Sequence, residues 1–248
     1  MKNTDTKILS DEQLDHFNTD LMLDSYWKVF LGELEKRIDT SKPFLVLDIG
    51  GGNGNFADVM IEKYPNVTVT ILDNSEYLLS LNTKNERKKL LLGSATRLDE
   101  VLSTQKFDLI TFNWVLHHLV MSTRKSSLKT IQDALKSASK YVNSNGYISI
   151  IENLYNGIAI DQYPSKFIFN LTSIKLPLIS KLVRKAGFNT AGTGVCFMSE
   201  KLIIRLIEQI SLEPVSSLKL DVWRYNALIR LVLHTQPMSM KNIWLTAK

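Results

Sequence analysis

Cysteine is nearly absent from the sequence, because Cys196 is the one cysteine among 248 residues. A single cysteine cannot form an intramolecular disulfide or the thiolate set of a zinc site, so both are excluded. Histidine is also scarce. The four residues are His16, His117, His118 and His234, and we expect no metal site. A chain without a disulfide framework is typical of a reducing compartment, so a cytoplasmic location is expected.

Long apolar runs are missing as well. No window of 18 uninterrupted apolar residues occurs, so we expect no membrane span. The N-terminus leads into an acidic stretch instead of an apolar core, so no signal peptide is expected. Apolar residues make up 44% and charged residues 22% of the chain. These values are typical of soluble globular proteins and exclude a disordered, collagen-like or coiled-coil chain.

The net charge of +5 is unevenly distributed. Residues 1–153 carry 18 basic and 20 acidic side chains, a balance of −2, whereas residues 154–248 carry 12 and 5, a balance of +7. A solvated basic face is the simplest interpretation, and attraction for an anionic substrate or a membrane surface is the alternative. Basic runs interleaved with aromatic residues are absent, which disfavours nucleic acid as a partner.

Strand-like and helix-like segments alternate along most of the chain. A capping box at 10–13 and apolar residues at helical spacing predict one or two helices over residues 11–38. The predicted strands are residues 44–47, 67–72, 90–92, 108–112, 147–151, 214–220 and 242–247. The main predicted helices between them are residues 55–64, 122–141 and 199–210. Such alternation predicts a parallel sheet with right-handed crossovers, and residues 154–198 are expected to lie over its carboxyl edge.

A glycine-rich turn lies between the first predicted strand and the helix after it. Its glycines are Gly50, Gly51, Gly52 and Gly54. Glycine permits a tight turn and a close approach of a ligand to the main chain. Gly52–Ala57 fits the dinucleotide-binding pattern, with Asp73 about 20 residues further on, so a nicotinamide enzyme is one candidate. Asp48, just before the glycines, favours a cationic ligand instead, because its carboxylate would repel a pyrophosphate.

Asp48–Gly54 resembles the Asp-x-Gly-x-Gly-x-Gly signature of class I S-adenosylmethionine-dependent methyltransferases. The resemblance continues in order from Phe44 to Asn153 through the motifs Leu72–Asn74, Gly93–Ala95, Lys106–Leu119 and Asn145–Asn153. The third of these ends in Leu-His-His-Leu, which is common in the small-molecule members of the family. An acid at the turn suits this cofactor, because S-adenosylmethionine carries a sulfonium and an ammonium group.

The resemblance implies an α/β fold: a Rossmann-like, seven-stranded, mostly parallel sheet with helices on both faces. The N-terminal helical segment and a lid-like insertion would close its pocket. S-adenosylmethionine is the implied cofactor, with the ribose hydroxyls on Asp73 and the adenine near Ser94, where many members have Asp. The implied cofactor-binding residues are Asp48, Gly50, Gly51, Gly52, Asp73, Asn74, Ser94, Ala95, Asn113 and Trp114.

Methyl transfer needs alignment of nucleophile, methyl group and sulfur, and an oxygen nucleophile also benefits from a base. Some similar sugar O-methyltransferases use a histidine of the fourth-strand motif with an acid at the end of the fifth strand. The matching residues are His117 or His118, with Glu152, and we expect His118 ahead of His117 as the base. The alternatives are that both histidines are structural, with one capping the sheet edge, and that Glu152 is a surface carboxylate or a partner for lysines of the insertion.

Aromatic residues offer further candidates with two interpretations each. Tyr26 and Trp27 would either cover the cofactor or belong to the core. Trp223–Tyr225 would either wall the acceptor pocket or pack against the sheet edge.

The predicted organisation is one domain over residues 1–248. It consists of an N-terminal helical cap at 1–40, a cofactor-binding core at 44–153, a substrate-side insertion at 154–198 and the end of the core sheet at 199–248. The predicted function is methyl transfer from S-adenosylmethionine to a small-molecule acceptor, anionic or lipidic, with oxygen as the expected acceptor atom. The alternatives are a nicotinamide-dependent oxidoreductase and a catalytically silent cofactor-binding module. Oligomeric state and methylation at nitrogen or carbon stay open.

Overall fold

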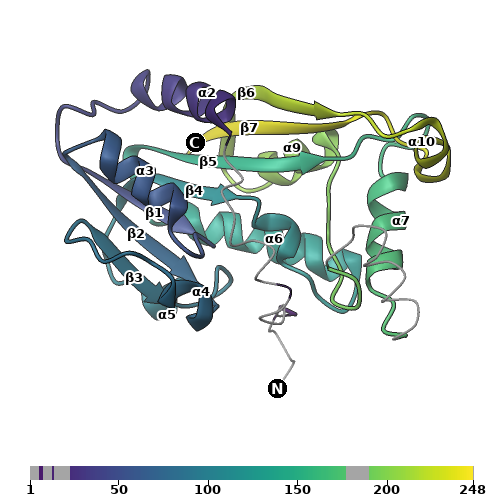
Figure 1. Ribbon diagram of the computed structural model, residues 1–248, viewed down its shortest axis with the longest axis horizontal. Coiled ribbons are helices and arrows are strands. Elements are labelled where there is room, and N and C mark those ends of the chain that lie inside the picture. Colours follow the sequence, from purple (N-terminus) through teal and green to yellow (C-terminus); the bar gives the residue numbers. More distant parts are fainter. Residues whose placement is uncertain (1–5, 8–12, 14–22, 177–189, 248) are drawn as a thin grey trace.

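The computed structural model describes residues 6–7, 13, 23–176 and 190–247. Apart from Gln13, the part of the predicted N-terminal helical segment before residue 23 lies outside the described residues, as does His16. The strands are β1 Phe44–Ile49, β2 Val67–Asp73, β3 Lys88–Leu92, β4 Phe107–Asn113, β5 Val142–Leu154, β6 Leu212–Trp223 and β7 Met238–Ala247. They form one sheet in the order β3-β2-β1-β4-β5-β7-β6 (Figure 1).

The sheet is parallel except at β7, which runs antiparallel to both of its neighbours. Each predicted strand overlaps an observed one, and the predicted seven-stranded, mostly parallel sheet is confirmed. Strand β1 is almost entirely buried because helices cover both faces of the sheet, which explains its nearly continuous apolar sequence.

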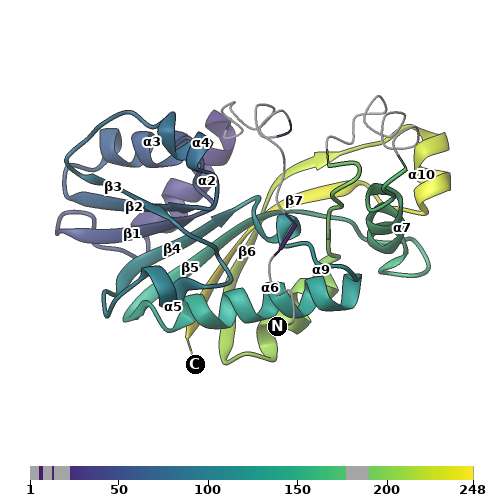
Figure 2. The ribbon, with the colours of Figure 1, turned by 90° about the horizontal axis from the view of Figure 1, so that it is seen from below.

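Helices form a layer on each face of the sheet (Figure 2). One layer holds α2 Asp24–Glu35, α3 Asn55–Lys63 and α4 Glu76–Ser80. The other holds α5 Leu98–Val101, α6 Arg124–Ser139 and α9 Glu200–Glu208. Each layer closes its own core. Phe30, Met60 and Trp244 are buried in the first, and Ile131 and Ile203 in the second.

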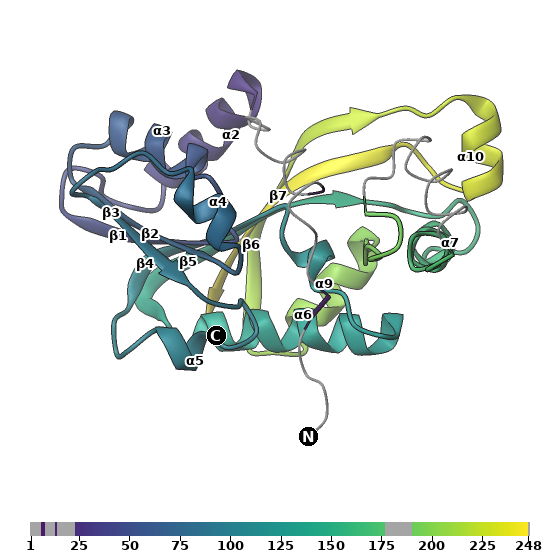
Figure 3. The ribbon, with the colours of Figure 1, turned by 60° about the horizontal axis from the view of Figure 1, so that its bottom comes forward.

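Two more helices lie beyond the carboxyl ends of the central strands: α7 Tyr163–Thr172 and α10 Ala227–Leu233 (Figure 3). Helix α10 connects β6 to β7 and packs on α7, and the sequence analysis did not predict it. Strand β6 is longer than predicted and ends at Trp223, which is exposed. Within the described residues, no helix has the length and apolar character needed to cross a bilayer.

The N-terminal aromatic residues belong to the core. Trp27 stacks on Phe56 with ring centroids 5.3 Å apart, and Tyr26 donates a hydrogen bond to Asp221 over 2.6 Å. Both are buried among the residues of the first layer. The interpretation of these side chains as a cofactor cover is therefore wrong, and the core interpretation holds.

Candidate functional site

One cavity opens at the carboxyl edge of β1, β2, β3 and β4, where four of the five sequence motifs meet. Nine of the ten predicted cofactor-binding residues line it: Gly50, Gly51, Gly52, Asp73, Asn74, Ser94, Ala95, Asn113 and Trp114. His118 lines the same cavity. Topology explains the gathering, because parallel strands bring all their carboxyl ends to one edge.

The glycine turn depends on left-handed backbone conformations. Gly52 has a φ of +51° and Gly54 a φ of +81°, which side-chain-bearing residues rarely adopt. A Cβ on Gly54 would collide with Asn82, whereas a Cβ on Gly52 would have no protein atom closer than 3.4 Å. Gly54 is thus fixed by packing within the protein, and Gly52 presents its open side toward the cavity.

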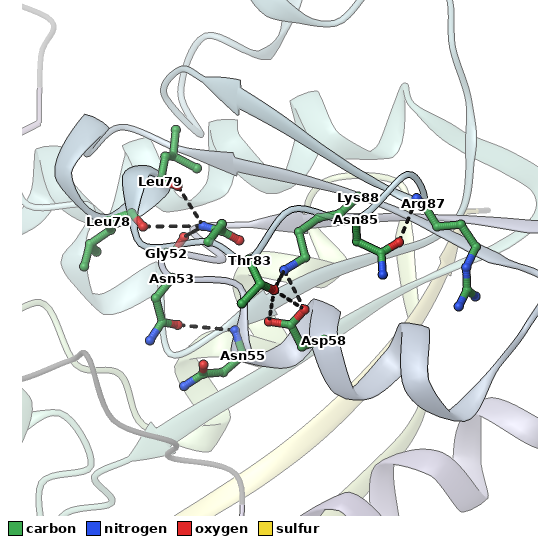
Figure 4. Close-up of polar contacts among 11 residues, drawn as sticks. Gly52, Asn53, Asn55, Asp58, Leu78, Leu79, Thr83, Asn85, Arg87 and Lys88 are labelled. Atoms are coloured by element: carbon green, nitrogen blue, oxygen red, sulfur yellow. Dashed lines mark hydrogen bonds and ion pairs between the residues drawn. The ribbon is translucent and has the colours of Figure 1, made fainter.

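Asn82 holds the turn from the neighbouring segment. Its amide donates to the carbonyl of Gly52 over 2.8 Å and also contacts the carbonyls of Leu78 and Leu79. Figure 4 labels these three partners. The same view shows Asp58 of α3 in an ion pair with Lys88 of β3, with 2.6 Å between the charged atoms. These contacts connect α3, α4 and β3 around the glycine turn. The position of the turn is therefore fixed by its neighbouring elements.

Asp73 is the last residue of β2, and backbone hydrogen bonds orient its carboxylate. One oxygen accepts a hydrogen bond from the N–H of Gly52 over 3.0 Å, and the other from the N–H of Ser75 over 2.8 Å. Burial raises the pKa of Asp73, and the backbone donors oppose that shift. Each carboxylate oxygen keeps a further lone pair, so a pair of adjacent hydroxyl groups could bind here.

Asp48 does not line the cavity and lies buried beneath the turn. Its Oδ1 accepts hydrogen bonds from Thr111 over 2.7 Å and from Asn113 over 3.3 Å. Its Oδ2 and Oδ1 of Asn113 are buried without a hydrogen-bond partner. Burial raises the pKa of Asp48 to about 7. Unpaired buried acceptors are costly, and here they provide negative potential under the turn that suits a cationic ligand group.

The three predicted catalytic residues lie together, but in a different pairing from the expected one. His117 Nδ1 lies 2.6 Å from Glu152 Oε2, so Glu152 pairs with His117 and not with the favoured base, His118. The two imidazole rings are 4.2 Å apart. Of the three, only His118 lines the cavity, and His117 and Glu152 are buried behind it.

The electrostatics of the pair favour a neutral imidazole at the cavity wall. Burial and the neighbouring His117 hold the pKa of His118 well below its ordinary value. His117 also contacts Phe197, with ring centroids 4.7 Å apart, and its carbonyl accepts from the N–H of Cys196 over 2.8 Å. Cys196 and Phe197, which follow α7 in the chain, therefore hold His117 in place.

Ten residues beyond the predicted site residues also line the cavity: Thr6, Lys7, Asn53, Leu72, Leu78, Gly93, Val115, Leu119, Thr193 and Gly194. Half of them, Asn53, Leu72, Gly93, Val115 and Leu119, lie within the motifs. Lys7 and Thr193 do not, and they meet across the cavity wall, where Lys7 Nζ donates to the carbonyl of Thr193 over 2.9 Å. No local pattern marks either residue. Trp223 and Tyr225 do not line this cavity, so they form no wall of it.

Residues 47–148 match the sequence model of a family described as a methyltransferase domain. The comparison with curated proteins finds no match. Among solved structures, a putative sarcosine dimethylglycine methyltransferase from Galdieria sulphuraria is similar at 10% identity and a TM-score of 0.59, over 88% of this chain and 83% of the other.

Two further structures share the fold. An O-methyltransferase from neocarzinostatin biosynthesis, in complex with S-adenosylmethionine and 2-hydroxy-5-methyl naphthoic acid, has 14% identity and a TM-score of 0.51, with 96% of this chain and 60% of that one covered. A protein described as a pericyclic reaction enzyme has 13% identity and a TM-score of 0.54, with 88% of this chain and 46% of that one covered. This chain thus spans about half to three fifths of their length.

The family match and the shared fold confirm the predicted resemblance to class I S-adenosylmethionine-dependent methyltransferases. The methyltransferase match over residues 47–148 and the S-adenosylmethionine bound in the similar neocarzinostatin O-methyltransferase agree with the predicted enzyme class and cofactor. The matched residues include the glycine turn, Asp73 and the histidine motif.

Proposed function

We propose that this chain, whose residues 47–148 form a methyltransferase domain, transfers a methyl group to an oxygen atom of a small-molecule acceptor. The main support for this proposal is that nine predicted cofactor-binding residues and His118 line one cavity. The similar O-methyltransferase from neocarzinostatin biosynthesis supports oxygen as the acceptor atom.

The residues present fit S-adenosylmethionine. Asp73 would hold the ribose hydroxyls with its oriented carboxylate. The unpaired acceptors of Asp48 and Asn113 would face the positive charge of the amino acid moiety, directly or through water. When bound, the cofactor supplies an activated methyl group on a sulfonium leaving group.

His118 would remove the acceptor proton. Its depressed pKa keeps the imidazole neutral near pH 7, so a ring nitrogen is free of the proton that would block base catalysis. His117 and Glu152 would act as positioning residues, because Glu152 fixes the orientation of His117 and the His117 ring packs on His118. Val115 and Leu119 supply apolar side chains to the same cavity.

An anionic acceptor fits the part of the cavity that Lys7 lines. Burial lowers the pKa of the Lys7 ammonium group, and the charge of Lys175 lowers it further, so a second positive charge acts on this site. Thr193 and Gly194, from the segment 154–198, line the same region. We propose that this segment is the substrate-side part of a single domain, as the sequence analysis expected.

A second candidate is a chain that binds S-adenosylmethionine but catalyses another reaction. The similar pericyclic reaction enzyme favours this alternative, because the same fold there carries a different chemistry. A nicotinamide-dependent oxidoreductase is a weaker candidate, because the buried carboxylate of Asp48 lies beneath the turn where a pyrophosphate would bind.

A thermal-shift panel followed by a methyl-transfer assay tests the proposal. We expect S-adenosylhomocysteine at 100 times its Kd to stabilise the protein by about 2.7 kcal/mol, and NAD to give no shift. Radiolabelled methyl transfer should then occur to carboxylated phenols or alcohols in an acceptor panel. A shift with NAD alone would establish the oxidoreductase, and cofactor binding without transfer to any acceptor would favour the second candidate.

Asp73→Ala should weaken the binding of S-adenosylhomocysteine by about tenfold to a hundredfold. Hydrogen bonds to a charged acceptor contribute on the order of 1.5–3 kcal/mol, which corresponds to that range. Isothermal calorimetry measures the affinity. Glu76→Ala is the matched control, because Glu76 is an exposed acid on α4 that does not line the cavity. Unchanged affinity in a folded Asp73→Ala protein would refute the ribose assignment.

A further inference from the structure

Helix α10 turns its apolar face to solvent. Leu228, Leu231 and Val232 follow the i, i+3, i+4 spacing of one helix face, and they are 70%, 75% and 52% exposed. Of the residues in α10, only Leu233 is buried, against α7 and its surroundings. Apolar helix stripes normally face the core, so this stripe, which none of the described residues covers, indicates a contact with a partner.

The apolar surface extends beyond the helix itself. Trp223, at the end of β6 just before α10, is 61% exposed. On the other side, the loop after β5 carries the exposed residues Ile158 and Ile160, and the N–H of Ile158 donates to the carbonyl of His234 over 3.0 Å. Figure 3 shows α10 at the outer end of the molecule, beyond the strands. A projecting apolar tip of this kind is accessible to a flat surface.

The charged side chains of α10 and of Trp223–Asn226 just before it are all of one sign. Arg224 and Arg230 are exposed, and among the described residues neither has a carboxylate within ion-pair distance. From residue 222 to the end of the sequence there are four basic residues and no acidic one. The nearest acid in sequence, Asp221, accepts a hydrogen bond from Tyr26 of α2. Asp161, in the loop beside Ile160, accepts a hydrogen bond from Ser199, so no described carboxylate pairs with either arginine.

We propose that the surface formed by Trp223, Leu228, Leu231 and Val232, called the α10 face and accompanied by the nearby arginines Arg224 and Arg230, docks on the surface of an anionic lipid bilayer. Leucine and tryptophan side chains enter the boundary between headgroups and acyl chains, and arginines bind the anionic headgroups. A second copy of the chain fits less well, because a two-fold interface over this face would bring the unpaired arginines of both copies together.

Co-sedimentation with vesicles tests the proposal on the full chain without cofactor, so its outcome is independent of the proposed methyl transfer. The vesicles contain phosphatidylcholine alone or a 70:30 mixture with phosphatidylglycerol. We expect binding to the anionic vesicles, and an at least tenfold weaker partition for Leu228→Ser/Leu231→Ser. The matched control is Leu23→Ser/Leu90→Ser, which removes two exposed leucines from other elements and should bind like the unmodified protein.

The charge component has its own variant. Each arginine near an anionic surface contributes about fivefold in affinity, so Arg224→Gln/Arg230→Gln should weaken the partition by about 25-fold, and added salt should do the same. Equal binding to both vesicle types, or no binding to either, would overturn the proposal. So would a dimer in sedimentation velocity that dissociates on Leu228→Ser/Leu231→Ser, since the α10 face would then be a contact between copies.

Discussion

His118→Ala is expected to lower turnover on the true acceptor by about 10²–10⁴-fold, the usual contribution of a positioned general base. His118 lines the cavity, and its pKa lies well below the ordinary histidine value, so it can accept a proton at neutral pH. Cofactor affinity should change little, because the base contacts the acceptor. Single-turnover rates at saturating cofactor, together with calorimetry, measure the two effects separately.

The pH profile gives a second readout of the same role. A base works only when unprotonated, so the wild-type rate should fall as the pH drops through the depressed pKa of His118, below the ordinary histidine range. Glu152→Gln should cause a smaller loss than His118→Ala, because Glu152 acts only through His117. His234→Asn, at the end of α10, is the histidine control. Near-normal turnover in both His118→Ala and His117→Ala would refute base catalysis and favour an acceptor that loses no proton in the transition state.

Local sequence predicted the central strands because each is a short apolar run with both faces covered. The exact start of β3 was not predictable. The strand begins at Lys88, whose buried ammonium pairs with Asp58 of α3, a contact that only the folded chain provides. Helix α10 was missed because it is short and six of its seven residues are apolar, so periodicity does not separate it from a strand.

The cofactor side of the site was predictable because strand order brings contiguous motifs to one edge. The acceptor side was not. His117 and His118 lie in a short 3₁₀ turn, Leu116–His118, where successive side chains point about 120° apart, and local sequence does not determine which one faces the cavity. Lys7 and Thr193 are 186 residues apart and meet only through the tertiary fold.

Gly52→Val is expected to abolish measurable binding of S-adenosylhomocysteine, a loss of at least a hundredfold, while the fold is kept. The added side chain would meet no protein atom closer than 3.4 Å at its Cβ, so its bulk enters the cavity where the cofactor should approach the backbone. The φ of +51° adds a strain of about 1–2 kcal/mol, which a typical domain tolerates. Calorimetry measures binding, and far-UV circular dichroism with thermal unfolding measures the fold.

Two variants separate ligand exclusion from strain. Gly52→Ala causes a similar backbone strain at positive φ but adds a much smaller side chain. If steric exclusion of the cofactor is the main effect, Gly52→Ala should therefore bind S-adenosylhomocysteine more tightly than Gly52→Val. Gly32→Val adds the same side chain on α2, where no atom lies within 4 Å, and should bind normally. If Gly52→Ala and Gly52→Val lose affinity equally, strain in the turn dominates. Wild-type affinity in Gly52→Val would place the cofactor outside this cavity, because a β-branched side chain and a ligand cannot share the space beside the same main-chain atoms.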